Sequence, residues 1–412
     1  GIGNPESIVL IHGLGDQAAH IWQSLTPELE KNYHVVAFDL PGFGRSEKKN
    51  ALYSPANYTS FISWVVERYT TGKVIILGHS MGGAITLHYA SHYPEKVKLL
   101  ILADVAGILH RLVITEFMSR LEQNKKWPNP LKRSLELPMN ALNRLTSEII
   151  KDLENEDPSV YMELVLNNSL MRKLILKGNP STIAGLATVE EDFSALFKKV
   201  KVPSLILWGE DDNVAPLRTG KLLAARLPST QFEVIQNAGH VPMSQNKREF
   251  NRLVLNALSS GIKPNGVMPS KIKGGDRVGR CSNESNIIFS GAYEKIEVTN
   301  CRNVSIENAS VKFIKVSGSS VSIENSLIKG GDVALIVNNS NLTVTAVNIE
   351  AETAIKASKS WLDMAGVRIV GLKSALLADE ESTVLFSVSQ IKSPFLSRYI
   401  HGLFHIKPEQ TF

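Results

Sequence analysis

An apolar run that ends abruptly in a histidine and a serine between glycines is the feature that most constrains the fold. Residues 73–77, KVIIL, lead into Gly78-His79-Ser80-Met81-Gly82, which is followed by Gly83-Ala84. In this G-x-S-x-G pattern a buried strand turns sharply into a helix, and small residues on both sides of the serine let the chain pass closely. The pattern predicts a strand ending near Leu77, a strained turn at Ser80 and a helix from about residue 83.

Residues 1–258 alternate between short apolar runs and helical patterns. Unbroken Val, Ile and Leu runs suit strands buried on both faces, and their alternation with helices predicts a doubly wound α/β sheet. Helices are expected from Ser54-Pro55 through Arg68, after Gly82, and over about 246–258. The strand-like apolar runs lie within residues 7–13, 34–42, 73–80, 98–104 and 204–211.

Residues 108–190 interrupt this alternation, because they hold helical patterns and several prolines but no strand pattern. We expect a helical cap inserted between two strands and placed over the strand ends. Its apolar residues, which would shape a hydrophobic pocket, include Leu109, Leu112, Phe117 and Trp127.

Composition excludes several classes of protein. A net charge of +5 over 412 residues gives no indication of nucleic-acid binding. The two cysteines are too few for a cysteine-rich metal site or a disulfide framework. The apolar runs fall short of the ~18–20 residues of a membrane span. The chain begins with Gly1 rather than Met, so a removed targeting segment or a truncation stays open.

Residues 259–275 contain Gly, Pro, Ser and Lys but no acidic residue, which is typical of a linker. Beyond it, over 276–412, apolar positions recur with gaps of 17 to 22 residues. Such a period predicts a parallel β-helix, in which each coil stacks on the one below. One ladder is Val304, Val321, Leu342, Leu362 and Val384, and a second is Ile296, Phe313, Ala334, Ala354 and Ala375.

Four asparagines of this region, Asn308, Asn325, Asn338 and Asn339, are expected at turns. Cys281 and Cys301 lie about one coil apart, which permits either a disulfide or two stacked buried thiols. A disulfide would favour an exported, periplasmic type of location over a cytoplasmic one.

The two ends of this region carry further expectations. Residues 393–407 show an apolar stripe after Ser-Pro, which predicts an amphipathic helix covering the last coil, with membrane attachment as the alternative. Glu307 and Glu324 occupy equivalent places in adjacent coils. They could bind calcium or a sugar hydroxyl, although solvent-facing charges are the simpler reading.

A serine becomes a nucleophile only with a base in hydrogen-bond reach, an acid that orients the base, and amide donors for the oxyanion. For this strand order the acid and the base should follow Ser80 in turn. We expect the acid to be Asp212 in GEDDNVAP (209–216), rather than Asp211, and the base to be His240 in QNAGHVPM (236–243). Asp104, at the end of another strand, is a rival for the acid.

The loop IHGLGDQ (11–17) follows the first predicted strand. It can offer the backbone N–H of Leu14 to an oxyanion, while Met81 offers the second N–H. His12 and His79 flank the site and are expected to pack and shape loops rather than to catalyse. The predicted site contains no metal and no cofactor.

These residues resemble the α/β-hydrolase superfamily over about 5–258, specifically its esterase, lipase and monoglyceride-lipase-like members. The matching pieces are VLIHGLG, FDLPGFGRS, GHSMGG, GEDDNVAP and AGHVPM. The resemblance implies chemistry through an acyl-enzyme, and an acid three positions after the strand-end glycine, which is Asp212.

Dehalogenase-like and epoxide-hydrolase-like members are excluded because they carry aspartate at the position of Ser80. Carbon–carbon bond hydrolases are not excluded. Family members usually have a β-hairpin ahead of the first strand seen here, so native residues before Gly1 are expected or the sheet lacks an edge.

The C-terminal region resembles right-handed parallel β-helices in architecture only. The leading hypothesis is thus a serine hydrolase that cleaves carboxylic esters, with a small-molecule or lipid-like substrate. Alternatives are an acyltransferase, a polysaccharide O-deacetylase that binds glycan on the β-helix, and a binding protein with a vestigial hydrolase domain. The β-helix could also form homo-oligomers through an exposed coil.

Overall fold

The computed structural model describes residues 1–113, 158–265, 275–379 and 381–405. The chain divides into two compact units, one made of Gly1–Gly220 with Leu227–Asn265 and the other of Lys221–Arg226 with Gly266–Phe412. The predicted domain limits, 1–258 and 276–412 around a linker, stay a prediction. Each unit is described by itself.

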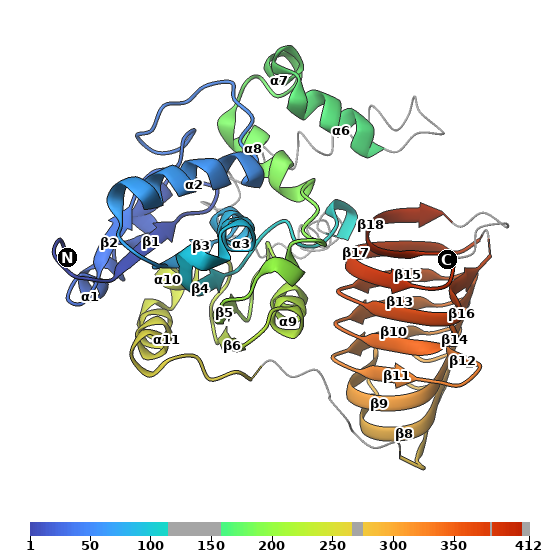
Figure 1. Ribbon diagram of the computed structural model, residues 1–412. Coiled ribbons are helices and arrows are strands. Elements are labelled where there is room, and N and C mark those ends of the chain that lie inside the picture. Colours follow the sequence, from blue (N-terminus) through green and yellow to red (C-terminus); the bar gives the residue numbers. More distant parts are fainter. Residues whose placement is uncertain (114–157, 266–274, 380, 406–412) are drawn as a thin grey trace. The chain divides into compact units, whose positions relative to one another are not determined.

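A parallel sheet with the strand order β2-β1-β3-β4-β5-β6 forms the centre of the first unit (Figure 1). Every neighbouring pair is parallel, as the alternation of strands and helices predicts. Every residue of β1, β3 and β5 is buried, which is why these runs contain apolar residues without alternation. The strands are β1 (Ser7–Ile11), β2 (His34–Ala37), β3 (Val74–His79), β4 (Val97–Ala103), β5 (Ser204–Gly209) and β6 (Thr230–Ile235).

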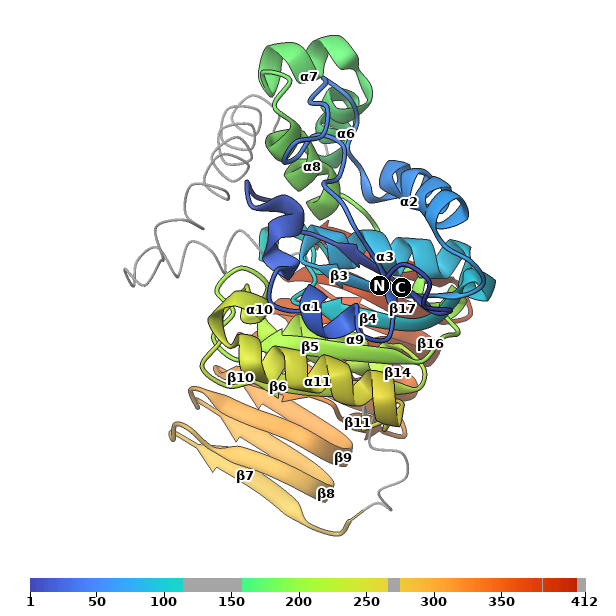
Figure 2. The same cartoon turned by 90° about the vertical axis from the view of Figure 1, so that its left-hand side faces the viewer.

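Helices cover both faces of this sheet (Figure 2). Trp22, Leu29 and Phe250 bring the short helices η1 and α1 and the long helix α11 onto one face. Helices α2 and α3 pack against each other on the other face. Helix α2 begins as predicted, because Ser54 Oγ accepts a hydrogen bond from the Asn57 amide at 3.2 Å. The bounds are η1 (Ala18–Trp22), α1 (Thr26–Leu29), α2 (Pro55–Tyr69), α3 (Met81–His92), η2 (Pro94–Lys96), η3 (Phe197–Lys199), α9 (Leu217–Arg226), α10 (Pro242–Gln245) and α11 (Lys247–Ser260).

The predicted insertion lies between β4 and β5, and its described part after residue 157 contains helices α6 (Pro158–Asn167), α7 (Ser169–Ile175) and α8 (Pro180–Val189). Asn168 and Asn179 cap α7 and α8 by accepting hydrogen bonds from amides of the first turn. Of the expected pocket residues, Leu109 is buried and Leu112 is half-buried. Phe117 and Trp127 lie outside the described residues. None of the described helices is long and apolar enough to cross a membrane.

The second unit is rich in strands, which form one largely parallel sheet closed into a ring. The first predicted ladder is confirmed, because Val321 pairs with Val304 and Leu342, and Leu362 pairs with Leu342 and Val384. The strands are β7 (Val278–Ser282), β8 (Ile288–Thr299), β9 (Val304–Ser317), β10 (Ser320–Glu324), β11 (Leu327–Lys329), β12 (Val333–Asn338), β13 (Asn341–Thr345), β14 (Asn348–Ser358), β15 (Trp361–Ala365), β16 (Arg368–Ala378), β17 (Thr383–Lys392) and β18 (Ser397–His405).

Two details of this unit differ from the prediction by one residue. Ile296 pairs with Ile314 instead of Phe313, because the backbone register, not apolar character alone, decides which residues stack. Asn338 is the last residue of β12, so the turn belongs to Asn339, which has a φ of 45°. Asn308 and Asn325 are also left-handed, as expected for turn residues.

Buried serines connect successive coils at one turn. The Ser319 amide donates to Ser340 Oγ at 3.0 Å, and the Ser340 amide donates to Ser360 Oγ at 3.2 Å. Cys301 continues this row, since its amide donates to Ser319 Oγ at 2.9 Å. Cys281 and Cys301 form a disulfide, so of the two alternatives the stacked thiols are wrong. Export, which a disulfide favours, stays a prediction.

The helix predicted over 393–407 is wrong within the described residues. Instead, β18 pairs antiparallel with β17, and Ser397 lies opposite Lys392. The last coil leaves backbone groups of β17 without a partner, and an added strand satisfies them where a helix would not. The sequence was ambiguous here, because the spacing of four between Ile400 and Phe404 is even and therefore fits a strand face as well as a helix face.

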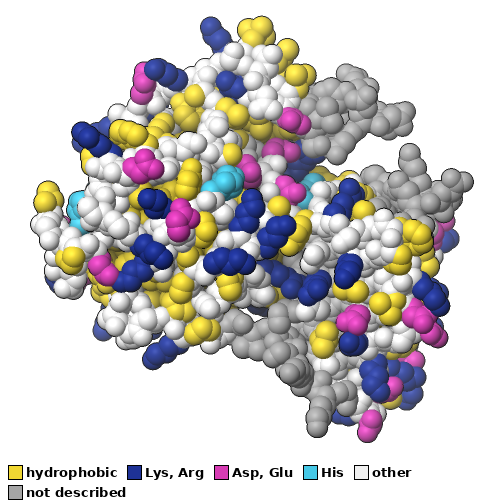
Figure 3. Space-filling model, viewed as in Figure 1, with side chains coloured by type: hydrophobic (Ala, Val, Ile, Leu, Met, Phe, Trp, Pro, Cys, Tyr) yellow, Lys and Arg dark blue, Asp and Glu magenta, His cyan; other side chains and the backbone are white. Residues whose placement is uncertain are grey.

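Charged side chains on the visible face of this unit are of both signs and interspersed (Figure 3). Several form ion pairs between neighbouring coils, such as Lys329 with Glu350 at 3.1 Å. Glu307 and Glu324 do stack in register. Exposed ion pairs such as that of Lys329 with Glu350 contribute little to stability.

Candidate active site

Ser80 lies in the sharp turn between β3 and α3 that the sequence predicts. Its backbone has φ 55° and ψ −121°, a conformation that costs a non-glycine residue about 1–3 kcal/mol. The Ser80 amide donates to the Ala103 carbonyl at 3.0 Å, so the neighbouring strand β4 holds the turn. The side chain thereby stands at the carboxyl end of the sheet, where the loops of several strands meet.

Glycines around Ser80 are required by close backbone contacts. A Cβ at Gly13 would lie 2.7 Å from the Ser80 Cβ. A Cβ at Gly78 would collide with the Gly82 carbonyl, and one at Gly82 would collide with the carbonyls of Ile11 and His12. The turn and the loop after β1 are therefore packed together without room for a methyl group.

Three predicted residues form one buried chain of hydrogen bonds. Ser80 Oγ lies 2.8 Å from His240 Nε2. The other ring nitrogen, Nδ1, lies 2.9 Å and 3.1 Å from the two carboxylate oxygens of Asp212. A carboxylate accepts, so Nδ1 carries the proton and Nε2 is left to accept from the Ser80 hydroxyl. This arrangement can withdraw the hydroxyl proton as the oxygen attacks.

Asp212 is held by its own loop after β5. Its Oδ1 accepts hydrogen bonds from the amides of Val214 at 2.8 Å and Ala215 at 3.0 Å. The neighbouring Asp211 is exposed and has no such bonds to His240 among the described residues. Of the two neighbouring aspartates, Asp212 is therefore the one that contacts the His240 ring.

Asp104, the rival acid, lies at the end of β4 with 0 % of its surface exposed. Its Oδ1 accepts from the Gly209 amide at 2.8 Å. Burial first, and then the adjacent charge of Asp212, raises the pKa of Asp104 well above its usual range. It is Asp212, not Asp104, whose carboxylate meets the His240 ring.

The two flanking histidines make contacts that shape loops. His12 Nε2 accepts from the Leu40 amide at 2.9 Å, and its Nδ1 lies 2.7 Å from the Gly13 carbonyl. His79 Nε2 lies 2.6 Å from the His240 carbonyl, so it holds the backbone of the proposed base. Burial, followed by the neighbouring His240, lowers the pKa of His79 to about 3, which keeps it neutral.

The amides predicted to bind an oxyanion come from the loop after β1 and from the first turn of α3. Within the described part of the chain, neither the Leu14 nor the Met81 amide has a protein acceptor. Met81 follows Ser80 directly, and the Gly13–Ser80 packing brings the loop of Leu14 to the same place. The assignment of these two amides as oxyanion donors stays a prediction.

Asp39 is a site-forming residue that the sequence reasoning did not single out. It accepts hydrogen bonds from the Ala19 amide at 3.0 Å and the Arg45 amide at 2.9 Å, and so joins the loops after β1 and β2. Burial alone would raise the pKa of Asp39, but these two hydrogen bonds together with the charges of His12 and Arg45 lower it. The available signal was its position directly after a strand, in FDLPG.

Asp104, Asp212 and His240 are the one group among the described residues that could hold a metal, with ligand atoms within 4.8 Å of one another. Both ring nitrogens of His240 are already engaged, one by Asp212 and one by Ser80. The donor set therefore fits a hydrogen-bond network better than a metal centre. That no metal or cofactor is needed stays a prediction.

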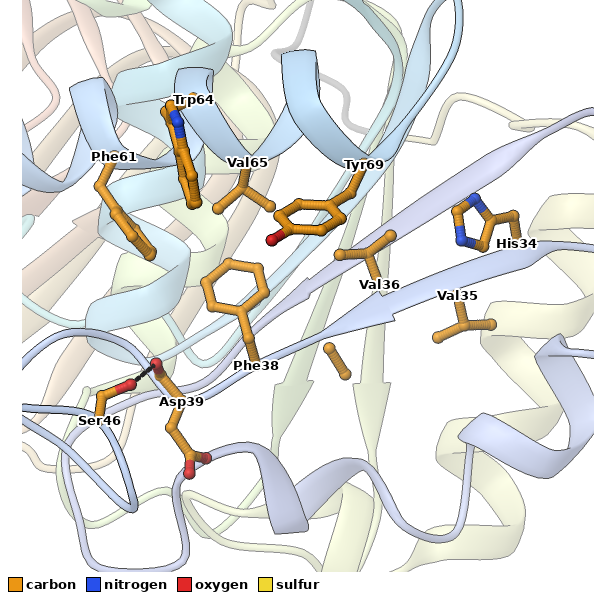
Figure 4. Close-up of a pocket in the computed structure, with 11 residues that line it drawn as sticks. His34, Val35, Val36, Phe38, Asp39, Ser46, Phe61, Trp64, Val65 and Tyr69 are labelled. Carbon is orange, nitrogen blue, oxygen red and sulfur yellow. Dashed lines mark hydrogen bonds between the residues drawn. The ribbon is translucent and has the colours of Figure 1, made fainter. Parts of the chain in front are cut away.

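A cavity of about 420 Å³ lies elsewhere, at the free edge of the sheet (Figure 4). Phe61, Trp64 and Tyr69 of α2 face Val36 and Phe38 across it. Neither Ser80 nor His240 lines this cavity, so it is not the site described above.

Comparisons with known proteins identify a family for residues 6–247. The profile of the family described as "alpha/beta hydrolase fold" matches residues 6–247. A relative by sequence is the 2-hydroxy-6-oxononadienedioate/2-hydroxy-6-oxononatrienedioate hydrolase of Escherichia coli (strain K12), 28 % identical over 261 residues, which covers 62 % of this chain and 87 % of that protein.

Two solved structures match part of this chain. A thermophilic esterase from Thermogutta terrifontis has a TM-score of 0.45 and 22 % identity, over 63 % of this chain and 92 % of that one. A meta-cleavage product hydrolase from Pseudomonas fluorescens IP01 has the same TM-score of 0.45, identity of 22 % and coverage of 63 % and 92 %. The family profile spans more than half of the chain and includes the β3–Ser80–α3 turn, and the chain therefore belongs to the alpha/beta hydrolase fold family.

Proposed function

We propose that this protein is a serine hydrolase that cleaves carboxylic esters through an acyl-enzyme. The observation that carries the proposal is the buried chain from Ser80 Oγ to His240 at 2.8 Å and on to Asp212 at 2.9 Å. The chain starts at a serine whose strained turn presents it at the ends of the strands. The resemblance to esterases in sequence motifs supports the same chemistry.

In the first step Ser80 Oγ attacks the ester carbonyl while His240 Nε2 takes the hydroxyl proton. Asp212 keeps the proton of His240 on Nδ1 and stabilises the imidazolium that forms. The amides of Leu14 and Met81 receive the developing oxyanion, and the N-terminus of α3 behind Ser80 favours the same negative charge. His240 then gives its proton to the leaving alcohol.

In the second step water attacks the acyl-enzyme, so that water is now the nucleophile and Ser80 is the leaving group. His240 Nε2 takes a proton from the water, the oxyanion forms again at the two amides, and Ser80 leaves with the proton restored. An alcohol in place of water would make the enzyme an acyltransferase. Product analysis with added acceptor alcohols separates these two outcomes.

The names of the sequence relatives favour a second candidate. These relatives are named as hydrolases of 2-hydroxy-6-oxononadienedioate, a keto acid rather than an ester. Transferred to this chain, Ser80 or a water activated by His240 would attack the 6-oxo carbonyl. The bond between C5 and C6 would then break, and His240 would give its proton to the carbon that leaves. Ser80, His240 and the two amides serve both reactions, so the substrate decides between them.

Two assays on one pair of proteins test these candidates. Hydrolysis of p-nitrophenyl esters of increasing acyl length is measured for the protein and for Ser80→Ala, with Ser60→Ala on the exposed surface of α2 as the matched control. Consumption of 2-hydroxy-6-oxononadienedioate is measured for the same variants. A Ser80-dependent ester rate supports the esterase, and its length optimum separates acetyl esters from lipid-like ones. A Ser80-dependent rate on the keto acid alone supports the second candidate.

An ester rate that survives in Ser80→Ala would contradict the proposed function. Glycan binding and homo-oligomer formation by the strand-rich unit stay predictions. Size-exclusion chromatography of the full chain tests the oligomer.

A further inference from the structure

A second carboxylic acid lies directly behind the first. Asp104 is completely buried, and one of its carboxylate oxygens lies within 4.8 Å of a carboxylate oxygen of Asp212 and of a ring nitrogen of His240. Asp104 Oδ1 has a donor, the Gly209 amide at 2.8 Å. Asp104 Oδ2 has none among the described residues. A buried carboxylate oxygen without a donor is unfavourable, so this atom needs an explanation.

The backbone of Asp104 has an unusual conformation that sets the direction of its side chain. Its φ of 46° is left-handed, a region in which Asp and Asn are among the few residues that are tolerated. The Asp104 amide donates to the Leu207 carbonyl of β5 at 3.1 Å. The ends of β4 and β5 thus direct the carboxyl group toward the loop that carries Asp212.

We propose that Asp104 is a positioning residue that stays protonated and donates the hydrogen of its Oδ2 to the Asp212 carboxylate, so that the buried pair carries one negative charge. The inference rests on the proposed function, since it assigns Asp104 a role in orienting the acid that faces His240. A proton on Asp104 Oδ2 turns an acceptor that lacks a donor into a donor whose acceptor is the Asp212 carboxylate.

The charges around the pair require the same assignment. Among the described residues, the titratable groups around Asp104 are Asp212 after β5, His240 after β6 and, next to His240, His79 of β3. His79 is neutral because burial lowers its pKa to about 3, and in the proposed reaction His240 gains a positive charge when it takes the Ser80 proton. Two adjacent buried carboxylates repel each other strongly, and burial followed by the charge of Asp212 raises the pKa of Asp104 accordingly.

The consequence is a fixed direction for the acid. Asp212 Oδ1 already accepts from Val214 and Ala215, and both of its oxygens face His240. A further donor from Asp104 holds the carboxylate from behind. The single charge then stays opposite Nδ1 of His240 while the imidazolium forms.

The test compares Asp104→Asn with Asp104→Ala. Asparagine keeps the acceptor for Gly209, offers an N–H in place of the O–H, and tolerates the left-handed backbone. We expect Asp104→Ala to lower kcat/KM about tenfold or more, and Asp104→Asn to restore most of that loss. In a plot of kcat/KM against pH, the acidic limb of Asp104→Asn should coincide with that of the wild type, because neither asparagine nor a protonated Asp104 is charged.

Three results would overturn the proposal. If Asp104 is ionised, Asp104→Asn removes a negative charge beside His240, and the acidic limb moves to lower pH by about one unit or more. If Asp104→Asn is as impaired as Asp104→Ala, the donated hydrogen is not what matters. If Asp104→Ala retains the full rate, Asp104 has no positioning role.

A readout without substrate keeps the inference independent of the proposed function. The low-field proton resonance of His240 Nδ1–H is followed against pH in the wild type and in Asp104→Asn. Coincident midpoints support a protonated Asp104, and a lower midpoint in the variant refutes it. Failure of the proposed function shows up separately, as an ester rate that persists in Ser80→Ala.

Discussion

Replacing Asp212 by asparagine should reverse the tautomer of His240. Oδ1 of Asp212 accepts from the amides of Val214 and Ala215, so the oxygen of an asparagine must stay there, because its NH₂ group would otherwise face two donors. The NH₂ group then faces His240 Nδ1, which lies 2.9 Å from Oδ2 in the wild type. Nδ1 must accept, the proton moves to Nε2, and Nε2 can no longer take the proton of Ser80.

The expected loss is large although the geometry is preserved. A base held in the wrong tautomer lowers kcat about 10⁴-fold, which corresponds to about 5.4 kcal/mol of transition-state stabilisation. The assay is p-nitrophenyl ester hydrolysis at pH 7.5, with thermal unfolding to verify that the variant folds. Asp211→Asn is the matched control, since it removes the same charge one residue away on an exposed side chain. If Asp212→Asn keeps more than a tenth of the wild-type kcat, the assignment of Asp212 as the orienting acid is refuted.

Three further predictions concern stability. Gly82→Ala should lower the free energy of unfolding by about 1–3 kcal/mol, because its methyl group collides with the carbonyls of Ile11 and His12; urea denaturation checks this against Gly331→Ala, where nothing lies within 4 Å, and equal stability of the two variants would contradict it. Cys281→Ala should destabilise the strand-rich unit by about 3 kcal/mol, the loop entropy of a bond that spans 20 residues; the same loss should follow reduction of the wild type, and no response to reductant would show that the bond is not formed in solution. Burial, followed by the charge of Asp192, raises the pKa of Glu191 from 4.5 to about 7, so the contribution of Glu191 to stability is present below pH 4.5 and is lost as the pH rises through 7. Glu191→Gln should therefore be more stable than the wild type at pH 8 but not at pH 4. Glu163→Gln on the exposed surface is the control and should show no such difference.

The local elements of the hydrolase unit could be predicted because each has a local physical signal. Buried strands show unbroken apolar runs, and Ser54-Pro55 marks the start of α2 through one side-chain acceptor and one fixed φ. The turn at Ser80 was predictable because only small residues permit the contacts around Gly78 and Gly82. The repeat of the strand-rich unit was predictable because stacked coils require apolar residues at matching positions.

The misassigned C-terminal segment shows where local signals fail. The spacing of Ile400 and Phe404 is compatible with both periods, and what selected the strand was the unpaired edge of β17, which is formed by residues earlier in the chain. The disulfide was similarly undecided, because a separation of one coil permits both a bond and two stacked thiols until the register of β7 and β8 is known.

For the site, the sequence by itself determined the residue types and their order: a serine at a strand-to-helix turn, then aspartates, then a histidine, each at a strand end. Only the tertiary structure decided the partners. It placed His240 between Ser80 and Asp212 although 160 residues separate the serine and the histidine, and it brought Asp104 behind Asp212 in a fully buried position. The reason is that strand order and register set which strand ends are neighbours, and the charge state of a carboxyl group depends on burial and adjacent charges, neither of which is encoded within any single segment.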